Sequence, residues 1–442
     1  MAAEKELVAS EAIAGLPSFL RNAPKESVLV PQEAWKKAVD TLARFSELPG
    51  RSTEEYKYTD TDKFFPSDIK QVDVIASSNG VSHNASVDEK SHQIVFRNGV
   101  FVETETRLPN HIRVTWGSKN RSELPQYAES YFASISDPGA DFFAALNTIR
   151  FHGALFIEVL PSEGLESSVR VIHHYDSDSS VSELYFPRMF IHAHPGANAC
   201  FLQWANNKPN GPERRVVGVT EIRACKNSKI CFYRLQHEGN NFAQIQDLSV
   251  LIEEGGEVDT NTLTIDCVWV RNNLSIRLAG RDATAHLNGL FIAAGRQHSD
   301  MRTLVEHQAE FCKSNQVYKG VLAGKSTGVF NGRIFVFKDA QKTDAYQSSK
   351  NILLTDDASV YSKPQLEIFA DDVKCSHGST TGQLSEDAQF YLQSRGLSKE
   401  SARSLLVSAF ASEVLETLKN DELRKIATEL VFEKMNKGLL VS

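Results

Sequence analysis

The sequence has few cysteines and no closely spaced pair of them. Six cysteines are spread over 442 residues, at Cys200, Cys225, Cys231, Cys267, Cys312 and Cys375. None forms a CxxC pair, which a zinc knuckle needs, and their dispersion argues against a disulfide framework. Any thiol chemistry is therefore expected from single cysteines.

Long apolar runs are also missing. The most apolar stretch, residues 149–160, contains His152 and Glu158 and is shorter than the roughly 20 apolar residues of a membrane-spanning helix. The first residues include Glu4 and Glu6 instead of a basic start followed by an apolar block, so neither a secretory signal nor an acid-poor transit peptide is predicted. We therefore expect a cytoplasmic protein.

An excess of basic charge is absent as well. Lysine and arginine number 48 against 56 aspartate and glutamate, for a formal net charge of −8, and no basic run stands apart. A nucleic-acid groove is therefore not expected. What is present, 41% apolar and 24% charged residues, is typical of a folded chain, and the length predicts about two to three domains.

The N-terminal part combines helical and strand-like patterns. Apolar residues recur at three- and four-residue steps over residues 31–48, which predicts a helix, and a second helix is expected over residues 124–146. Between them, Asn98-Gly99 predicts a hairpin turn. The polar segment 51–60, with two tyrosines, is compatible with a surface arm.

Residues 153–373 read as one large β block. Short runs rich in Val, Ile, Leu, Phe and Thr alternate with Gly, Asn and Asp turns, with almost no helical period. More than 200 residues of short strands joined by tight polar corners favour a solenoid, in which each coil buries its inward face against its neighbours. Because no fixed period is found, these residues alone leave a sandwich open.

The end of the chain is predicted to be helical. Ser385 and Ser398 are expected to cap two helices, Gly396 to end the first, and Asn420 to begin a third. The second and third helices carry apolar stripes, which favour mutual packing in a small helical module over a partner groove, although both uses can coexist.

Two short motifs imitate functional sites. Gly324-Lys325-Ser326 resembles the end of a phosphate-binding loop, but Lys319 stands where the first glycine belongs and a strand-like run follows.

His192-Ala193-His194 places two imidazoles on one face of a strand, a spacing suited to a metal ion. No carboxylate follows within residues 195–199, so a structural pair is favoured.

Cys375-Ser376-His377 is the candidate that carries chemistry. In an extended strand Cys375 and His377 project the same way, which presents a thiolate and an imidazole side by side to a metal. From these residues alone, a buried cysteine beside a satisfied histidine is the simpler interpretation.

The surroundings of this pair resemble a known family. Residues 371–384, DDVKCSHGSTTGQL, are similar to the C-terminal signature of the SufB/SufD family of iron–sulfur cluster assembly proteins. The resemblance extends over about residues 285–415. Shared blocks are Gln297-His298-Ser299-Asp300, Tyr318-Lys319-Gly320, Phe330-Asn331-Gly332, 340–347, 363–368, Phe390-Tyr391-Leu392 and Ser394-Arg395-Gly396. Cys-Ser-His-Gly at 375–378 favours the SufD branch over the SufB branch, whose chains are usually longer and tend to have a His-Glu-Ala type sequence there.

The resemblance implies a fold and a role. It implies an N-terminal helical or mixed region (1–152), a central right-handed parallel β-helix (153–378) and a C-terminal helical domain (379–442). It also implies a non-catalytic scaffold subunit that pairs with a SufB-like subunit through the β-helix and binds a SufC-like ABC ATPase through the C-terminal helices.

The resemblance also implies a metal site at the subunit interface. A transient iron–sulfur cluster would be shared there with the SufB-like subunit, with His377 as a metal ligand and Cys375 as the neighbouring thiol. No cofactor is expected to stay bound to the isolated chain, which could form a homodimer.

A β-helix polysaccharide lyase is the alternative. Acidic residues such as Asp356, Asp357, Asp371 and Asp372 could bind calcium and an anionic sugar. Such lyases are usually exported and lack this C-terminal signature, so the assembly role is favoured.

Overall fold

Two long β-sheets form the centre of the molecule. The computed structural model describes residues 29–45, 47–65, 69–72, 91–118, 124–162, 168–177, 179–207 and 211–435. Sheet A consists of β1 (Lys70–Gln71), β4 (Ile112–Ser118), β5 (Gly153–Val159), β7 (Glu183–Tyr185), β8 (Arg188–Ala193), β10 (Arg214–Ala224), β12 (Gly239–Ile252), β14 (Cys267–Leu278), β16 (His298–His307), β18 (Thr327–Val336) and β20 (Ser359–Ile368). Sheet B consists of β2 (Gln93–Arg97), β3 (Val100–Phe101), β6 (Ser168–Tyr175), β9 (Asn198–Asn207), β11 (Lys229–Gln236), β13 (Glu257–Thr264), β15 (Thr284–Ala293), β17 (Lys313–Leu322), β19 (Asp344–Leu353) and β21 (Lys374–Gly382).

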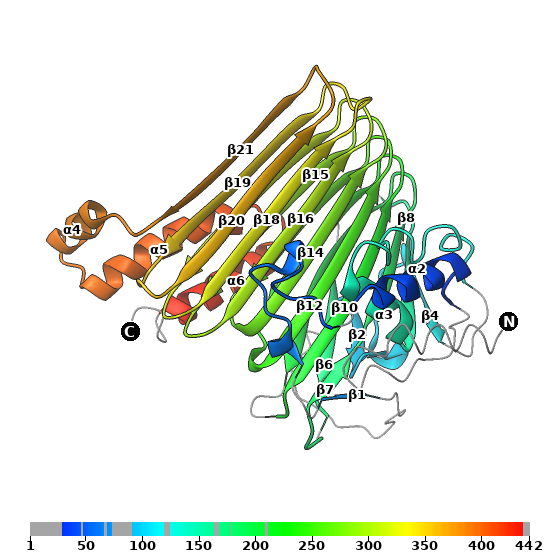
Figure 1. Ribbon diagram of the computed structural model, residues 1–442, viewed down its shortest axis with the longest axis horizontal. Helices are drawn as coiled ribbons and strands as arrows, with labels where there is room; N and C mark the ends of the chain where they lie inside the picture. Colours follow the sequence, from blue (N-terminus) through cyan, green and yellow to red (C-terminus); the bar gives the residue numbers. More distant parts are fainter. Residues whose placement is uncertain are drawn as a thin grey trace.

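The sheets are the two faces of a parallel β-solenoid (Figure 1). Each strand from β8 to β19 pairs in parallel with the strand two further along the chain, as β16 does with β18 and β17 with β19, so every coil contributes one strand to each sheet. The coils differ in length. Glu257 lies opposite Thr284, 27 residues later, whereas Lys313 lies opposite Asp344, 31 residues later. The predicted solenoid is confirmed, and its uneven coils explain why the sequence shows no fixed period.

The space between the sheets is the main core. Strand side chains alternate between this interior and the outer face, and the interior is filled largely by Val, Ile, Leu, Phe and Ala. The sheets extend beyond residues 153–378 on both sides. β4 pairs antiparallel with β5, β2 pairs in parallel with β6, and β21 continues to Gly382.

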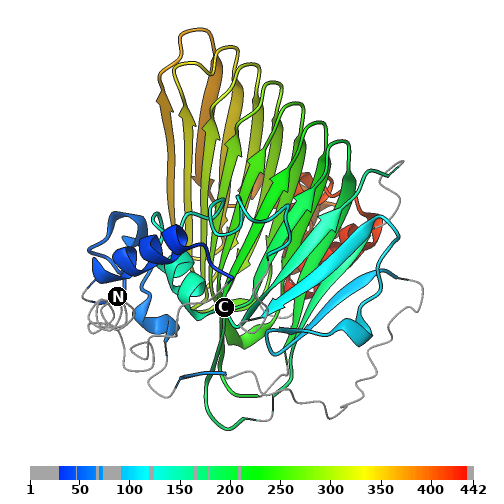
Figure 2. The same cartoon turned by 90° about the vertical axis from the view of Figure 1, so that its right-hand side faces the viewer.

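Helical segments cover the outer faces of the solenoid. The helices are α2 (Gln32–Ala43), α3 (Phe142–Arg150), α4 (Glu386–Ser394), α5 (Lys399–Leu415) and α6 (Asp421–Lys434), with 3-10 turns at Glu54–Tyr56, Asp62–Phe64 and Glu103–Glu105. The N-terminal elements pack on sheet A, and α5 and α6 pack on sheet B, on opposite sides of the solenoid (Figure 2). No helix in the described ranges is both long enough and apolar enough to cross a membrane.

The helix expected over residues 124–146 is mostly wrong. Residues 126–135 form turns, and α3 begins only after Asp141, whose carboxylate accepts hydrogen bonds from Phe143 N and Ala144 N. Two backbone N–H groups that would bond to carbonyl groups within a helix bond instead to a carboxylate that is distant in the sequence. Glu221 on β10 accepts from Ala133 N and Ser136 N, both at 3.0 Å.

The local signals at the other element ends are confirmed. Asn98 and Gly99, with φ of 49° and 82°, form the turn between β2 and β3. Ser385, Ser398 and Asn420 each accept a backbone hydrogen bond at the start of a C-terminal helix.

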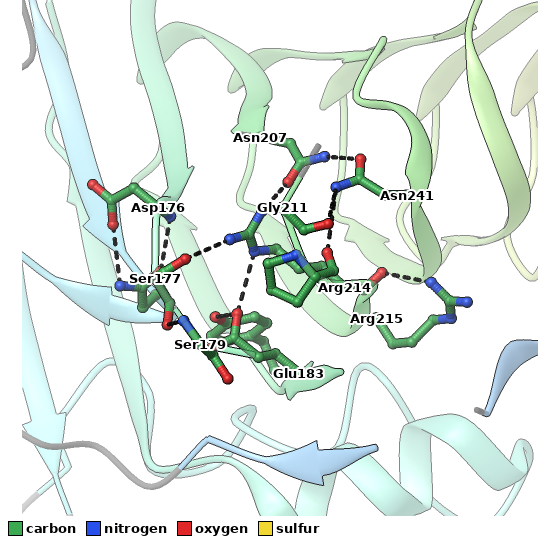
Figure 3. A network of polar contacts seen from close by, with 12 residues as sticks. Asp176, Ser177, Ser179, Glu183, Asn207, Gly211, Arg214, Arg215 and Asn241 are labelled. Atoms are coloured by element: carbon green, nitrogen blue, oxygen red, sulfur yellow. Dashed lines mark hydrogen bonds and ion pairs between the residues drawn. The ribbon is translucent and has the colours of Figure 1, made fainter. Parts of the chain in front are cut away.

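A buried arginine joins the two sheets near the N-terminal end of the solenoid (Figure 3). The Arg214 guanidinium donates from Nε to Glu183 Oε2 at 3.2 Å, from one Nη to Asn207 Oδ1 at 2.6 Å, and from the other Nη to Ser177 O at 2.9 Å. The side chain is fully buried, and a buried charge is tolerated only when it is paired and hydrogen-bonded in this way.

Candidate functional site

The Cys375-Ser376-His377 segment lies on β21, the last strand of sheet B. Ala345 on β19 is opposite Cys375, and Gln347 is opposite His377. Both β19 residues are buried between the sheets, so the strand alternation directs Cys375 and His377 toward the same interior space. Ser379, two residues further, confirms this direction, since its Oγ donates to Ser362 Oγ of β20 at 2.8 Å across the space between the sheets.

This interior space is open at the end of the solenoid. β20 and β21 are the terminal strands of sheets A and B, and in the described part of the chain no further coil stacks on them. His377 is therefore exposed although it faces inward, and Cys375 is half-buried against the last apolar residues of the core. The common orientation of the two side chains is as expected from their spacing.

Burial affects the chemistry of the thiol. It raises the pKa of Cys375 above its ordinary value, and the Asp344 carboxylate adds to this shift by disfavouring a second negative charge. The thiol is therefore protonated at neutral pH, and a metal ion would have to displace its proton.

The free edge of β21 presents backbone groups at the same place. Lys374 N donates to Thr343 O at 2.8 Å, so the even-numbered residues of β21 point their backbone groups toward β19. Since these groups alternate along a strand, residues 375, 377, 379 and 381 point theirs to the open edge. On β20, by contrast, the residue whose N–H would face the open edge at mid-strand is Pro364, which has none.

The His192-Ala193-His194 pair does share a face. The two rings meet edge to face, with centroids 4.5 Å apart, and His194 Nε2 lies 2.8 Å from Glu158 Oε1 of the neighbouring strand β5. His192 is buried under Tyr127, and burial lowers its pKa to about 4. Across the described ranges, no group of three or more His, Cys, Asp or Glu side chains is placed to hold a metal ion.

The other motifs considered from sequence form structural parts of the solenoid. Gly324-Lys325-Ser326 is a corner between β17 and β18, with Gly324 at φ +65° in close contact with Gly295 of the preceding coil. Strand β18, and no helix, follows it. Of the acidic residues considered for calcium, Asp357 pairs with Lys325 and Asp372 with Lys342, so the lyase reading gains no support.

Two cysteines that are far apart in the sequence lie together in the fold. Cys200 on β9 and Cys231 on β11 lie directly opposite each other in sheet B, although 31 positions separate them in the chain. Both are buried in the layer between sheet B and helices α5 and α6. Coil register, which is not visible in the sequence, brings them together.

The three C-terminal helices differ in how much of their apolar surface is covered. Val407 and Ala411 of α5 and Ala427 of α6 are buried against the outer face of sheet B. None of the residues of α4 is buried, and Phe390 and Tyr391 are 74% and 58% exposed. Figure 1 shows α4 projecting beyond the solenoid near the end of β21.

Two family models match this sequence. The SufBD core domain of the SUF system for iron–sulfur cluster assembly matches residues 174–410, and the SufBD N-terminal region matches residues 23–171. The chain belongs to the SufBD family. Proteins of this family are components of iron–sulfur cluster assembly, and the core match spans the solenoid from β6 to α5.

Several relatives support the assignment. The chain is 33% identical to iron–sulfur cluster assembly protein SufD of Escherichia coli over 217 residues, which are 49% of this chain and 51% of that protein. It is 27% identical over 412 residues to a SufBD family protein of Synechocystis, with 89% of this chain and 88% of the relative covered. Chloroplastic protein ABCI7 of Arabidopsis thaliana is 27% identical over 399 residues, with 89% and 82% covered. The match to SufD thus spans about half of that relative's length.

Proposed function

We propose that this SufBD protein is a non-catalytic scaffold subunit of a cytoplasmic iron–sulfur cluster assembly complex. The observation that supports it most directly is the open end of the solenoid, where Cys375 and His377 face the interior beside the free edge of β21. In this arrangement a second chain that covers the open end also covers these two side chains. The site would be completed by pairing and would be exposed in the isolated chain.

The partner at the open end is a SufB-like chain with the same solenoid architecture. A long free strand edge is a template for pairing with another chain, because its N–H and C=O groups lack partners. Strand β21 offers these groups at residues 375, 377, 379 and 381, whereas Pro364 interrupts the corresponding row on β20. The β21 edge is thus the better pairing surface, and it can also accept a second copy of this chain when no SufB-like subunit is present.

The nascent cluster is cargo held between the two chains. His377 is the metal ligand, since its imidazole is exposed and faces the interface. Cys375 is the neighbouring thiol with the smaller role, because burial and Asp344 favour its protonated form. Iron–sulfur clusters are usually held by four ligands, so two from this chain leave positions for the partner. A shared and incomplete ligand set suits a cluster that must be released.

A SufC-like ATPase binds through the C-terminal helices, and α4 provides the contact. The apolar faces of α5 and α6 are used against sheet B, whereas Phe390 and Tyr391 on α4 form an exposed aromatic pair. Exposed aromatic side chains of this kind are typical anchors of protein interfaces.

Co-expression with SufB-like and SufC-like chains tests this function. The tagged chain should purify as a complex with both untagged partners, and the complex should accumulate iron and sulfide when these are supplied. A chain that stays alone in the presence of both partners would contradict the proposal.

A further inference from the structure

A basic cleft lies on the outer face of the solenoid, whereas the proposed cluster site faces the interior. It has a volume of about 550 Å³ and is formed between the segment 51–63 and the corners that lead into sheet A. Five lysine and arginine side chains line it, and one carboxylate, Asp60. The cations are Arg51, Lys57, Lys63, Arg296 and Lys325. In a chain with a net charge of −8, so many cations around one cleft are a marked local excess.

Two of the cations come from successive coils of the solenoid. Arg296 lies in the corner between β15 and β16, and Lys325 lies in the next corner, between β17 and β18. The two corners stack directly, since Lys325 N donates to Gly295 O at 2.6 Å. Parallel strands lie about 4.8 Å apart, so the stacking brings two exposed positive side chains onto neighbouring levels. The two positive charges repel each other, and a bound anion would reduce this repulsion.

The opposite row of corners, from sheet A to sheet B, shows a different arrangement. There the cation of one coil is matched by a carboxylate of the next. The ion pairs are Lys226 with Glu254 at 2.9 Å, Arg281 with Glu310 at 2.6 Å, and Lys342 with Asp372. In the cleft, Lys325 has only a long, exposed contact of 3.8 Å with Asp357. Arg51 and Arg296 make no ion pair within the described ranges. Lys63 has a similarly long contact of 3.7 Å with Asp60. The cations of the cleft thus have fewer close carboxylate partners than those of the opposite corners.

The second wall of the cleft is held rigidly in place. The Tyr56 ring is buried, and its centroid lies 4.0 Å from Cζ of Arg271. The Thr59 hydroxyl donates to Asp300 Oδ2 at 2.5 Å. Both partners project from the outer face of sheet A. These contacts fix the segment 51–63 across the coils, so its three cations face those of the corners at little entropic cost.

We propose that this cleft binds a small ligand that carries a chain of phosphates. Guanidinium groups bind phosphate oxygens in pairs, and ammonium groups add point charge from other directions. Cations on two walls suit two or three linked phosphates better than a single one. The recognition differs from that of a phosphate-binding loop, because Lys325 contributes its side-chain charge and no helix N-terminus follows it. The inference is independent of the cluster site, which faces the interior.

Calorimetric titration of the full chain tests the proposal. Tripolyphosphate and ATP are titrated separately at low ionic strength without magnesium, with orthophosphate as a third probe. We expect saturable binding of tripolyphosphate and much weaker binding of orthophosphate. The variant Arg296→Gln with Lys325→Gln should weaken tripolyphosphate binding by about tenfold or more, which corresponds to about 1.4 kcal/mol.

The matched control removes the same charges from the opposite corners. Lys226→Gln with Arg281→Gln changes the net charge equally, and it should alter the affinity by less than about twofold. Tighter binding of ATP than of tripolyphosphate would identify a nucleotide as the ligand, and equal binding would identify the phosphate chain alone. No saturation at millimolar tripolyphosphate, or an equal loss in the control, would overturn the proposal.

Discussion

Gln347 and His377 lie opposite each other on β19 and β21, yet Gln347 is fully buried and His377 is exposed. Both side chains face the space between the sheets, and the difference arises because the coil that contains β21 covers Gln347 while no further described coil covers His377. Positions that are equivalent in the repeat thus have different uses. One fills the core, and the other is available to a partner or to cargo.

This exposure predicts that His377→Ala separates cluster formation from folding. The variant should change the free energy of unfolding by no more than about 0.5 kcal/mol, because little packing is lost. It should still assemble with SufB-like and SufC-like partners, but iron and sulfide should no longer accumulate on the complex. Cys375→Ala should have the smaller effect on accumulation. Iron and sulfide analysis of the purified complex, together with size-exclusion chromatography, measures both properties.

Ser376→Ala is the matched control for this comparison. Ser376 lies between the two residues on β21 and faces the other way, so its loss should leave both assembly and accumulation unchanged. Normal accumulation with His377→Ala would exclude the proposed ligand role.

The parts of the fold that could be predicted from sequence are those with local causes. The helix caps at Ser385, Ser398 and Asn420 depend on a hydrogen bond to a residue three positions away, and the Asn98-Gly99 turn depends on two adjacent residues. The common direction of Cys375 and His377 also follows from strand alternation alone.

The remaining features depend on contacts between distant residues. The segment 51–60 is an arm, but its place on sheet A is fixed by Arg271, whose Nη1 donates to Glu55 O across 216 positions of sequence. That Cys375 and His377 stand at an open end depends on which coil is last, and coils of unequal length conceal the register. Nothing local to these residues contains that information.

Docking of the ATPase is predicted to depend on exposed side chains of α4. Phe390→Ser together with Tyr391→Ser should abolish pull-down of a SufC-like ATPase, with little change in stability because neither ring is buried. Phe432→Ser on α6 is the control, since this ring is also exposed but lies on a different helix. Retention of the ATPase by the double variant would place the docking surface elsewhere.

Truncation at residue 385 is a less selective experiment. It would remove α5 and α6 along with α4, and the apolar residues of sheet B beneath them, such as Leu263, Leu290 and Val321, would face water. We therefore expect the truncated chain to be destabilised as well as unable to bind the ATPase.

Buried histidines predict a loss of stability in mild acid. Burial lowers the pKa of His307 to about 4, and its Nε2 lies 2.9 Å from Ser314 Oγ. The unfolded chain binds this proton near pH 6.5, so the stability contributed by the neutral ring is complete above that pH and is lost as the pH falls toward 4. By pH 5 the loss is about 2 kcal/mol for one such residue.

A neutral substitution tests this dependence. His307→Gln cannot take up the proton, so urea unfolding of the variant between pH 7 and pH 5 should show a shallower decline than that of the parent chain. A decline should remain, because burial also lowers the pKa of His173 to about 3 and of His298 to about 4. Identical slopes for the two proteins would contradict the assignment to His307.

Removal of the Glu221 carboxylate is predicted to cost much stability. The carboxylate is fully buried, 2.8 Å from a guanidinium nitrogen of Arg188, which is also fully buried. Its two oxygens also accept the backbone N–H groups of Ala133 and Ser136, which attach the turns of residues 126–135 to sheet A. Glu221→Gln would leave Arg188 without its counter-charge and replace one acceptor by a donor that faces other donors. Loss of one partner from a buried ion pair costs about 3–5 kcal/mol.

An exposed ion pair with a similar distance between nitrogen and oxygen is the control for Glu221→Gln. Arg333 and Glu367 on β18 and β20 approach to 2.7 Å with both side chains exposed, and Glu367→Gln should cost less than about 1 kcal/mol. Urea unfolding measures both variants, and hydrogen exchange should show faster exchange at residues 128–136 in Glu221→Gln alone. Glu221 is the acceptor for the amides of both Ala133 and Ser136. Equal losses of stability in the two variants would therefore mean that other contacts hold residues 126–135 on sheet A.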